Sequence, residues 1–128
     1  MQGRVAADTD LATFIGVTFR SVWALELLCH LRGKGADGSS AEALVSGLRA
    51  SDLIVQRSLD ELVAAGLVSL DKQGRATYAP ATAELDRLVG QVDERYSHSP
   101  DAVRRVIVRA SNPGASAFAD AFRLGKKP

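Results

Sequence analysis

The sequence predicts a mostly α-helical protein with a small β-hairpin, in a chain of 128 residues that fits one domain. Apolar residues recur at three- and four-residue steps along most of the chain, and this spacing places them on one face of an α-helix. Two short runs, 67–70 and 76–79, flank a polar loop that contains glycine, which is the pattern of a hairpin. A hydrophobic share of 46% is that of an ordinary globular protein.

The N-terminal part of the chain divides into a polar arm and a helix. Residues 1–13 have few apolar positions, so we expect a flexible arm there. Residues 19–32 carry apolar side chains on more than one helical face, which predicts a helix that is buried on several sides. The glycines Gly33 and Gly35 end this helix.

Two further helices are predicted next. Ser39 and Glu42 have the spacing of a capping box, in which both side chains bond the first free amides of a helix. The residues predicted to point inward from this helix are Ala43, Leu44, Val45 and Leu48. The following helix, 51–65, begins at Ser51 as its N-cap and ends at Gly66, which adopts the left-handed conformation at low cost. Its buried stripe consists of Val55, Leu59 and Leu62.

Residues 81–128 are predicted to form C-terminal helices. The first is marked by Leu85, Leu88, Val89 and Val92. Ser99-Pro100-Asp101 is a start signal for the second, because proline suits the first helical position and an acid suits the first turn. Its inward positions are Val103, Val106, Ile107 and Ala110, and a last short helix is expected at 117–124. These helices carry more apolar positions than a small domain covers alone, so we expect a homodimer. The predicted dimer interface consists of Val103, Val106, Ile107, Phe118 and Phe122.

Residues 55–68, VQRSLDELVAAGLV, resemble the V-x-R-x-L-x-x-L-x-x-x-G-L-V run of bacterial transcriptional regulators of the MarR type. The resemblance extends over about half of the chain, residues 19–80. It implies a winged helix-turn-helix domain in residues 14–80, with helix 51–65 in the major groove of double-stranded DNA and the wing 67–79 against the DNA backbone. It also implies that the protein is a DNA-binding regulator of transcription.

The resemblance assigns DNA contacts to residues of the reading helix and of the wing. From the helix, the residues that would face the groove are Ser51, Ile54, Gln56 and Arg57. Glutamine pairs with adenine and arginine with guanine, each through two hydrogen bonds. From the wing, Lys72 and Arg75 are expected to reach phosphates.

The charge balance leaves a second function open. The formal net charge is +1, and residues 14–80 hold seven basic and seven acidic residues, whereas a dedicated nucleic-acid-binding domain often has a basic face. Asp60 and Glu61 lie on the reading helix, where they oppose phosphates or pair with Arg57 at the i+3 and i+4 positions. The alternative function is that of a winged helix that binds another protein, for example part of the transcription machinery, with little or no sequence-specific DNA binding. For Lys72 and Arg75 the alternative is an ordinary solvated hairpin tip.

No enzyme, metal site or cofactor is expected. The single cysteine, Cys29, excludes an internal disulfide and a multi-cysteine zinc site, and its leucine neighbours predict a core position. Neither His30 nor His98 has a recognisable catalytic or metal-binding partner. The apolar run 22–31 is too short to cross a bilayer, and the first residues lack the apolar core of a signal peptide. We therefore expect a cytoplasmic protein that does not enter a membrane.

Overall fold

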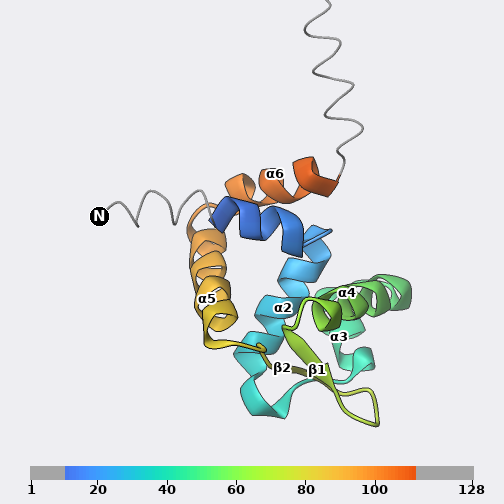
Figure 1. The fold of residues 1–128 in the computed structure, drawn as a ribbon. Helices are drawn as coiled ribbons and strands as arrows, with labels where there is room; N and C mark the ends of the chain where they lie inside the picture. Colours follow the sequence, from blue (N-terminus) through green and yellow to red (C-terminus); the bar gives the residue numbers. More distant parts are fainter. Residues whose placement is uncertain (1–10, 112–128) are drawn as a thin grey trace, which may run out of the picture.

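The computed structural model describes residues 11–111, which are mostly helical and contain one two-stranded antiparallel sheet (Figure 1). In chain order the elements are the helical segment Leu11–Thr18, α2 (Val22–Lys34), the 3-10 helix η1 (Gly35–Asp37), α3 (Ala41–Leu48), α4 (Asp52–Ala64), β1 (Val68–Leu70), β2 (Ala76–Tyr78), α5 (Ala83–His98) and α6 (Pro100–Ser111). The prediction of a helix-rich chain with a small hairpin is confirmed. The last helix predicted at 117–124, with Phe118 and Phe122, lies outside the described residues.

Helix α2 is the central element of the fold. Figure 1 shows α3 and α4 on one side of α2 and α5 on the other. The segment Leu11–Thr18 and α6 lie at one end of α2, and the hairpin lies at the other end. The buried residues of α2 are Ala24, Leu25, Leu27, Leu28 and Leu31. Because α2 packs against α3, α4, β2 and α6, the predicted burial on several sides is confirmed.

The N-terminal region departs from the prediction. Residues 11–13, which we assigned to the flexible arm, are helical, and Leu11 and Ile15 are buried in the core. The first predicted helix starts too early, because Phe19 fills the corner between the segment Leu11–Thr18 and α2. Ser21 is the N-cap of α2, and its hydroxyl accepts a hydrogen bond from the amide of Ala24 at 3.2 Å.

The capping box predicted at Ser39 is not formed. Ser40 is the N-cap of α3, and its hydroxyl accepts from the amide of Ala43 at 3.1 Å. The backbone of Ser39 pairs instead with Ala76 of β2 through two hydrogen bonds of 2.8 Å. Ser39 is therefore an extension of the sheet, and Ala43, predicted to point inward, is exposed on α3. Leu44 is the one side chain of this helix that is fully buried.

Helix α4 and its termini match the prediction closely. The hydroxyl of Ser51 caps the helix by accepting from the amide of Ile54 at 3.1 Å. Val55, Leu59 and Leu62 are buried, which confirms the predicted stripe. Gly66 follows the helix with a φ of 77°, the left-handed conformation that glycine adopts without strain.

The hairpin is antiparallel, with Val68 opposite Tyr78 and Leu70 opposite Ala76. Its loop is held by the Asp71 carboxylate, which accepts hydrogen bonds from the backbone amides of Gln73 at 2.9 Å and Arg75 at 2.8 Å. The β1–β2 connection is thus a defined turn whose tip projects away from the core (Figure 1).

Helices α5 and α6 complete the core. Polar contacts join α5 to α2: Arg32 pairs with Asp93 at 2.7 Å, and the hydroxyl of Tyr96 donates to Glu26 at 2.7 Å. On α6 the buried residues are Val103 and Ile107, whereas Ala110, predicted to point inward, is exposed.

Within residues 11–111, no single helix is long and apolar enough to cross a membrane. Leu11–Thr18 and Val22–Asp37 meet this test of length and composition only as a pair, and they are bent by 104° relative to each other.

Candidate nucleic-acid interface

Helix α4 has one buried face and one exposed face. Its buried side packs on α2 and α3, and its N-terminal end lies away from α5 (Figure 1). The exposed residues in its N-terminal half and at its cap are Ser51, Asp52, Leu53, Gln56 and Arg57. The exposed face thus carries hydrogen-bond donors, hydrogen-bond acceptors and an apolar group, while the opposite face of the helix packs on α2 and α3.

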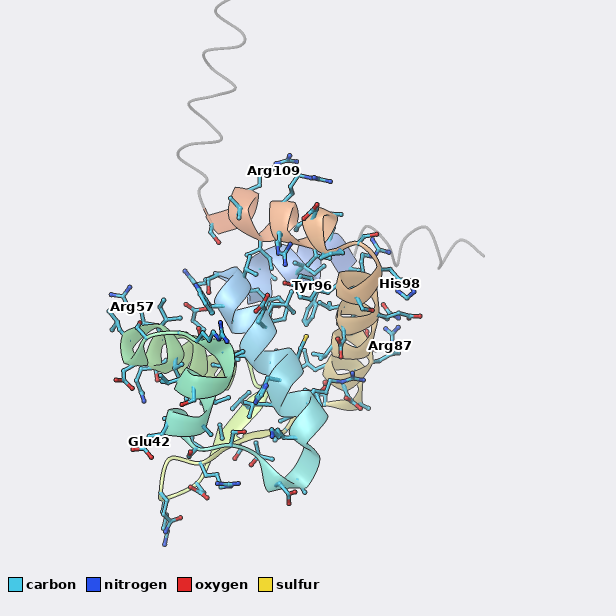
Figure 2. All side chains as sticks on the ribbon, turned by 180° about the vertical axis from the view of Figure 1, so that it is seen from behind. Glu42, Arg57, Arg87, Tyr96, His98 and Arg109 are labelled. Atoms are coloured by element: carbon cyan, nitrogen blue, oxygen red, sulfur yellow. The ribbon has the colours of Figure 1, made fainter. Side chains whose placement is uncertain are left out.

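Gln56 and Arg57 point outward, as predicted for residues that read DNA. Figure 2 shows Arg57 extending away from α4. Within residues 11–111 its guanidinium forms neither a hydrogen bond nor an ion pair, so the alternative pairing with Asp60 or Glu61 is not present. Its five donor hydrogens are available to a ligand.

The apolar group on the exposed face is Leu53 rather than Ile54. Ile54 is half-buried, whereas the side chain of Leu53 is 59% exposed. The helix geometry explains this difference: each residue turns by about 100°, so Leu53 lies almost opposite the buried Val55 and Ile54 lies at its side. The predicted buried stripe of Val55, Leu59 and Leu62 therefore already implies that Leu53, not Ile54, is the exposed apolar residue. Ser51 is exposed, but its hydroxyl oxygen caps the helix.

The two basic residues of the hairpin differ in their surroundings. Lys72 is exposed in the turn of the hairpin. Arg75 is also exposed, but its Nε donates to the backbone carbonyl of Asp37 at 2.7 Å, which holds the side chain beside η1. Lys72 is therefore the freer of the two cations for a phosphate.

Asp60 and Glu61 lie in the C-terminal half of α4, beside the corner between the Leu11–Thr18 segment and α2. They border an open depression of about 410 Å³ whose other lining residues are Val17, Thr18, Arg20, Ala64 and Ala65. Asp60 is exposed, and Glu61 is half-buried with its Oε1 atom inaccessible and without a hydrogen-bond partner. These carboxylates are thus about one turn from Gln56 and Arg57, toward the other end of the helix.

The residues proposed for a dimer interface are placed differently from the prediction. Val103 and Ile107 are buried within the single chain, and Val106 is half-buried. The segment Leu11–Thr18 lies against α6: a Cβ built on Gly16 would be 3.4 Å from the Cβ of Ala110. Val103 and Ile107 are therefore core residues of one chain rather than interface residues.

In the described part of the chain, residues 11–111, the cysteine and the two histidines do not form a second site. Burial, followed by the nearby Asp93 carboxylate, raises the pKa of the Cys29 thiol to about 12, so the thiol stays protonated and unreactive at neutral pH. No cluster of three or more His, Cys, Asp or Glu side chains within residues 11–111 is arranged to hold a metal ion. His98, at the end of α5, contacts the backbone carbonyl of Glu94 through Nδ1 at 2.8 Å.

The candidate site therefore consists of the exposed N-terminal half of α4 and, from a separate element, the hairpin tip with Lys72. Comparisons with protein families, with curated proteins and with solved structures found no match for this chain.

Proposed function

We propose that residues 14–80 are a winged helix-turn-helix domain and that the protein binds double-stranded DNA as a transcriptional regulator. In this proposal α4 enters the major groove and the β1–β2 hairpin is the wing. The observation that carries the proposal is the exposed half of α4, where Gln56 and Arg57 point outward without partners in residues 11–111 while the opposite face is fixed in the core.

The connections between the elements support this proposal. Helices α3 and α4 are joined by Arg49, Ala50 and Ser51, and a turn of three to four residues is typical of a helix-turn-helix. The pairing of Ser39 with Ala76 adds a third chain segment to the hairpin and ties the start of α3 to the wing. Because α3 and β1 also pack against α4, the expected reading helix and wing belong to one packed unit.

The side chains of the exposed face have the chemistry needed to read bases. Arginine can donate two hydrogen bonds to guanine, glutamine can bond adenine in the same way, and an exposed leucine can contact the methyl group of thymine. Arg57, Gln56 and Leu53 supply these three groups. Lys72 on the wing would supply a phosphate contact that positions the helix but does not select a sequence.

The test uses a duplex selected by this protein from a random DNA pool. We expect Arg57→Ala to weaken binding by about 1–3 kcal/mol and to relax the preference at one base pair. The control is Arg105→Ala, which removes the same charge from an exposed position on α6. Equal losses for the two variants, with the base preference intact, would contradict a reading role for Arg57.

A second candidate function is binding of a basic protein partner through α4. It is favoured by the zero net charge of residues 14–80 and by the two adjacent carboxylates of Asp60 and Glu61. Changing both residues to lysine separates the candidates. If the carboxylates only border DNA phosphates, non-specific DNA binding becomes tighter and the preferred sequence is kept. If they contact a basic partner, the complex with that partner is lost.

A further inference from the structure

A groove leads from the end of α6 to the C-terminal half of α4. It consists of two adjacent open depressions of about 530 Å³ and 410 Å³, and both are lined by Val17 and Arg20. Ser111, the last described residue, lines the first depression, and its hydroxyl donates to the backbone carbonyl of Arg20 at 2.5 Å. The chain therefore leaves α6 at one end of this groove.

The middle of the groove is apolar and uncovered within residues 11–111. The side chain of Val17 is 75% exposed, more than that of any other large hydrophobic residue in this part of the chain. Small residues surround it in the two depressions, namely Gly16, Ala64, Ala65 and Ala110. An apolar side chain placed over Val17 would remove this surface from water.

The far end of the groove is acidic. Neither the Asp60 nor the Glu61 carboxylate forms an ion pair within residues 11–111, and the buried Oε1 of Glu61 has no hydrogen-bond partner. Arg20 also lines the depression, but its guanidinium pairs with neither carboxylate. A buried carboxylate oxygen without a partner is costly, so this end favours a ligand that brings cations.

The C-terminal residues of the same chain have the matching chemistry in the matching order. Residues 112–128 carry Phe118 and Phe122 first and end with a basic group, and they contain one acid, Asp120. The basic group consists of Arg123, Lys126 and Lys127. These 17 residues span about 25 Å as a helix and about 55 Å when extended, which suffices to cross two depressions of this size.

We propose that residues 112–128 dock in this groove of their own chain. Phe118 and Phe122 cover Val17, and the basic group lies against Asp60 and Glu61. The contact goes beyond the proposed DNA binding, and it would exclude a basic partner from Asp60 and Glu61. It would neutralise the two carboxylates and cover the C-terminal half of α4.

Paramagnetic broadening in the full-length protein tests this contact. A nitroxide is attached at Gly125→Cys in a Cys29→Ala background, and amide signals of the ¹⁵N-labelled chain are recorded with the label oxidised and reduced. We expect loss of signal at residues 17–20 and 60–65 and none at residues 71–74 in the hairpin loop. If Cys29→Ala impairs folding, Cys29 is retained, because its protonated thiol reacts slowly with the label.

The double variant Asp60→Asn with Glu61→Gln tests the contact between the basic group and the two carboxylates. It should restore most of the lost signal at residues 60–65. The matched control is Glu42→Gln with Asp52→Asn, two exposed carboxylates outside the groove, which should change nothing. Unbroadened signals at residues 17–20 and 60–65 would overturn the proposal, and so would an equal effect of the two double variants. Broadening in a mixture of ¹⁵N-labelled chains without nitroxide and unlabelled chains with nitroxide would also overturn it, because the segment would then occupy a second copy.

Discussion

Gly38 and Gly35 have the same backbone conformation but different surroundings. Both have a φ of 65°, in the region that favours glycine. A Cβ on Gly38 would lie 2.2 Å from the carbonyl oxygen of Ala76, whereas a Cβ on Gly35 would meet nothing within 4 Å. The close approach at Gly38 is what allows Ser39 to pair with β2.

These two glycines form a matched pair for a stability measurement. We expect Gly35→Ala to lower the free energy of unfolding by about 1 kcal/mol, from backbone strain alone. Gly38→Ala should cost a further ~1–3 kcal/mol, because the pairing of Ser39 with Ala76 has to shift. Urea unfolding of both variants provides the comparison. Equal losses would show that the sheet does not extend to Ser39.

The raised pKa of the Cys29 thiol leads us to expect a lower free energy of unfolding at alkaline pH. Its pKa is about 12 in the folded chain, against 9.0 for a free thiol, so the folded state holds the proton more tightly than the unfolded state. The contribution of the protonated thiol to the free energy of unfolding is fully present below about pH 9, and it is lost as the pH rises toward 12. Unfolding measured from about pH 8 to about pH 11 should show a smaller decline for Cys29→Ala than for the original chain. Parallel declines would contradict the burial of the thiol.

At the level of the elements, α4 anchors the candidate site through its buried stripe. We expect Leu59→Ala to destabilise the fold by about 2–5 kcal/mol, because it opens a cavity in the core. Leu53→Ala is the matched control on the same helix, and its effect should stay within about 0.5 kcal/mol because the side chain is exposed. Thermal unfolding of the two variants compares these effects. Similar changes in both would mean that the register of α4 is wrong.

Gly66 sets the direction of the chain between α4 and the hairpin. Its φ is 77°, and a Cβ there would lie 3.4 Å from the Cβ of Ala81, which is a tight but tolerable contact. The main cost of Gly66→Ala is therefore backbone strain, and we expect a loss of about 1 kcal/mol in the free energy of unfolding. A change near zero in urea unfolding would contradict this origin of the cost.

The elements that the sequence predicted well are those with local signals. The Ser51 cap, the stripe of α4 and the positive φ of Gly66 each depend on residues a few positions apart. Gln56 and Arg57 were placed outward by the resemblance of residues 55–68 to a family run, and both are exposed. The pairing of Ser39 with Ala76 joins positions far apart in the chain, and two adjacent serines gave no local means to decide which one caps α3.

The N-terminal region explains the largest error in the prediction. Leu11, Ile15 and Phe19 repeat at four-residue steps, but Leu11 was assigned to the arm, Phe19 to the first helix and Ile15 to no element. The helical segment that they form lies against α6. Val103 and Ile107 are covered within one chain, so the apolar excess from which we inferred a dimer surface is smaller than the sequence alone implies.

At the scale of the whole molecule, the proposed reading of half-sites on DNA calls for two reading helices. We propose that the protein acts as a homodimer, because two copies of α4 about 34 Å apart would meet two half-sites on one face of DNA. The interface has to lie outside Val103 and Ile107. Light scattering should therefore give twice the chain mass at tens of micromolar protein. A monomer under these conditions would count against a dimeric regulator.

A salt titration tests whether the exposed face of α4 and the hairpin tip bind DNA. Because residues 14–80 are neutral overall, we expect weak binding that is detectable at low salt and falls steeply as salt is added. Lys72→Ala should weaken binding to the selected and scrambled duplexes alike and reduce the salt slope by about one unit, since one phosphate contact is removed. Fluorescence anisotropy of labelled duplexes gives both quantities. If neither duplex is bound at low salt, α4 and the hairpin do not form a DNA-binding surface.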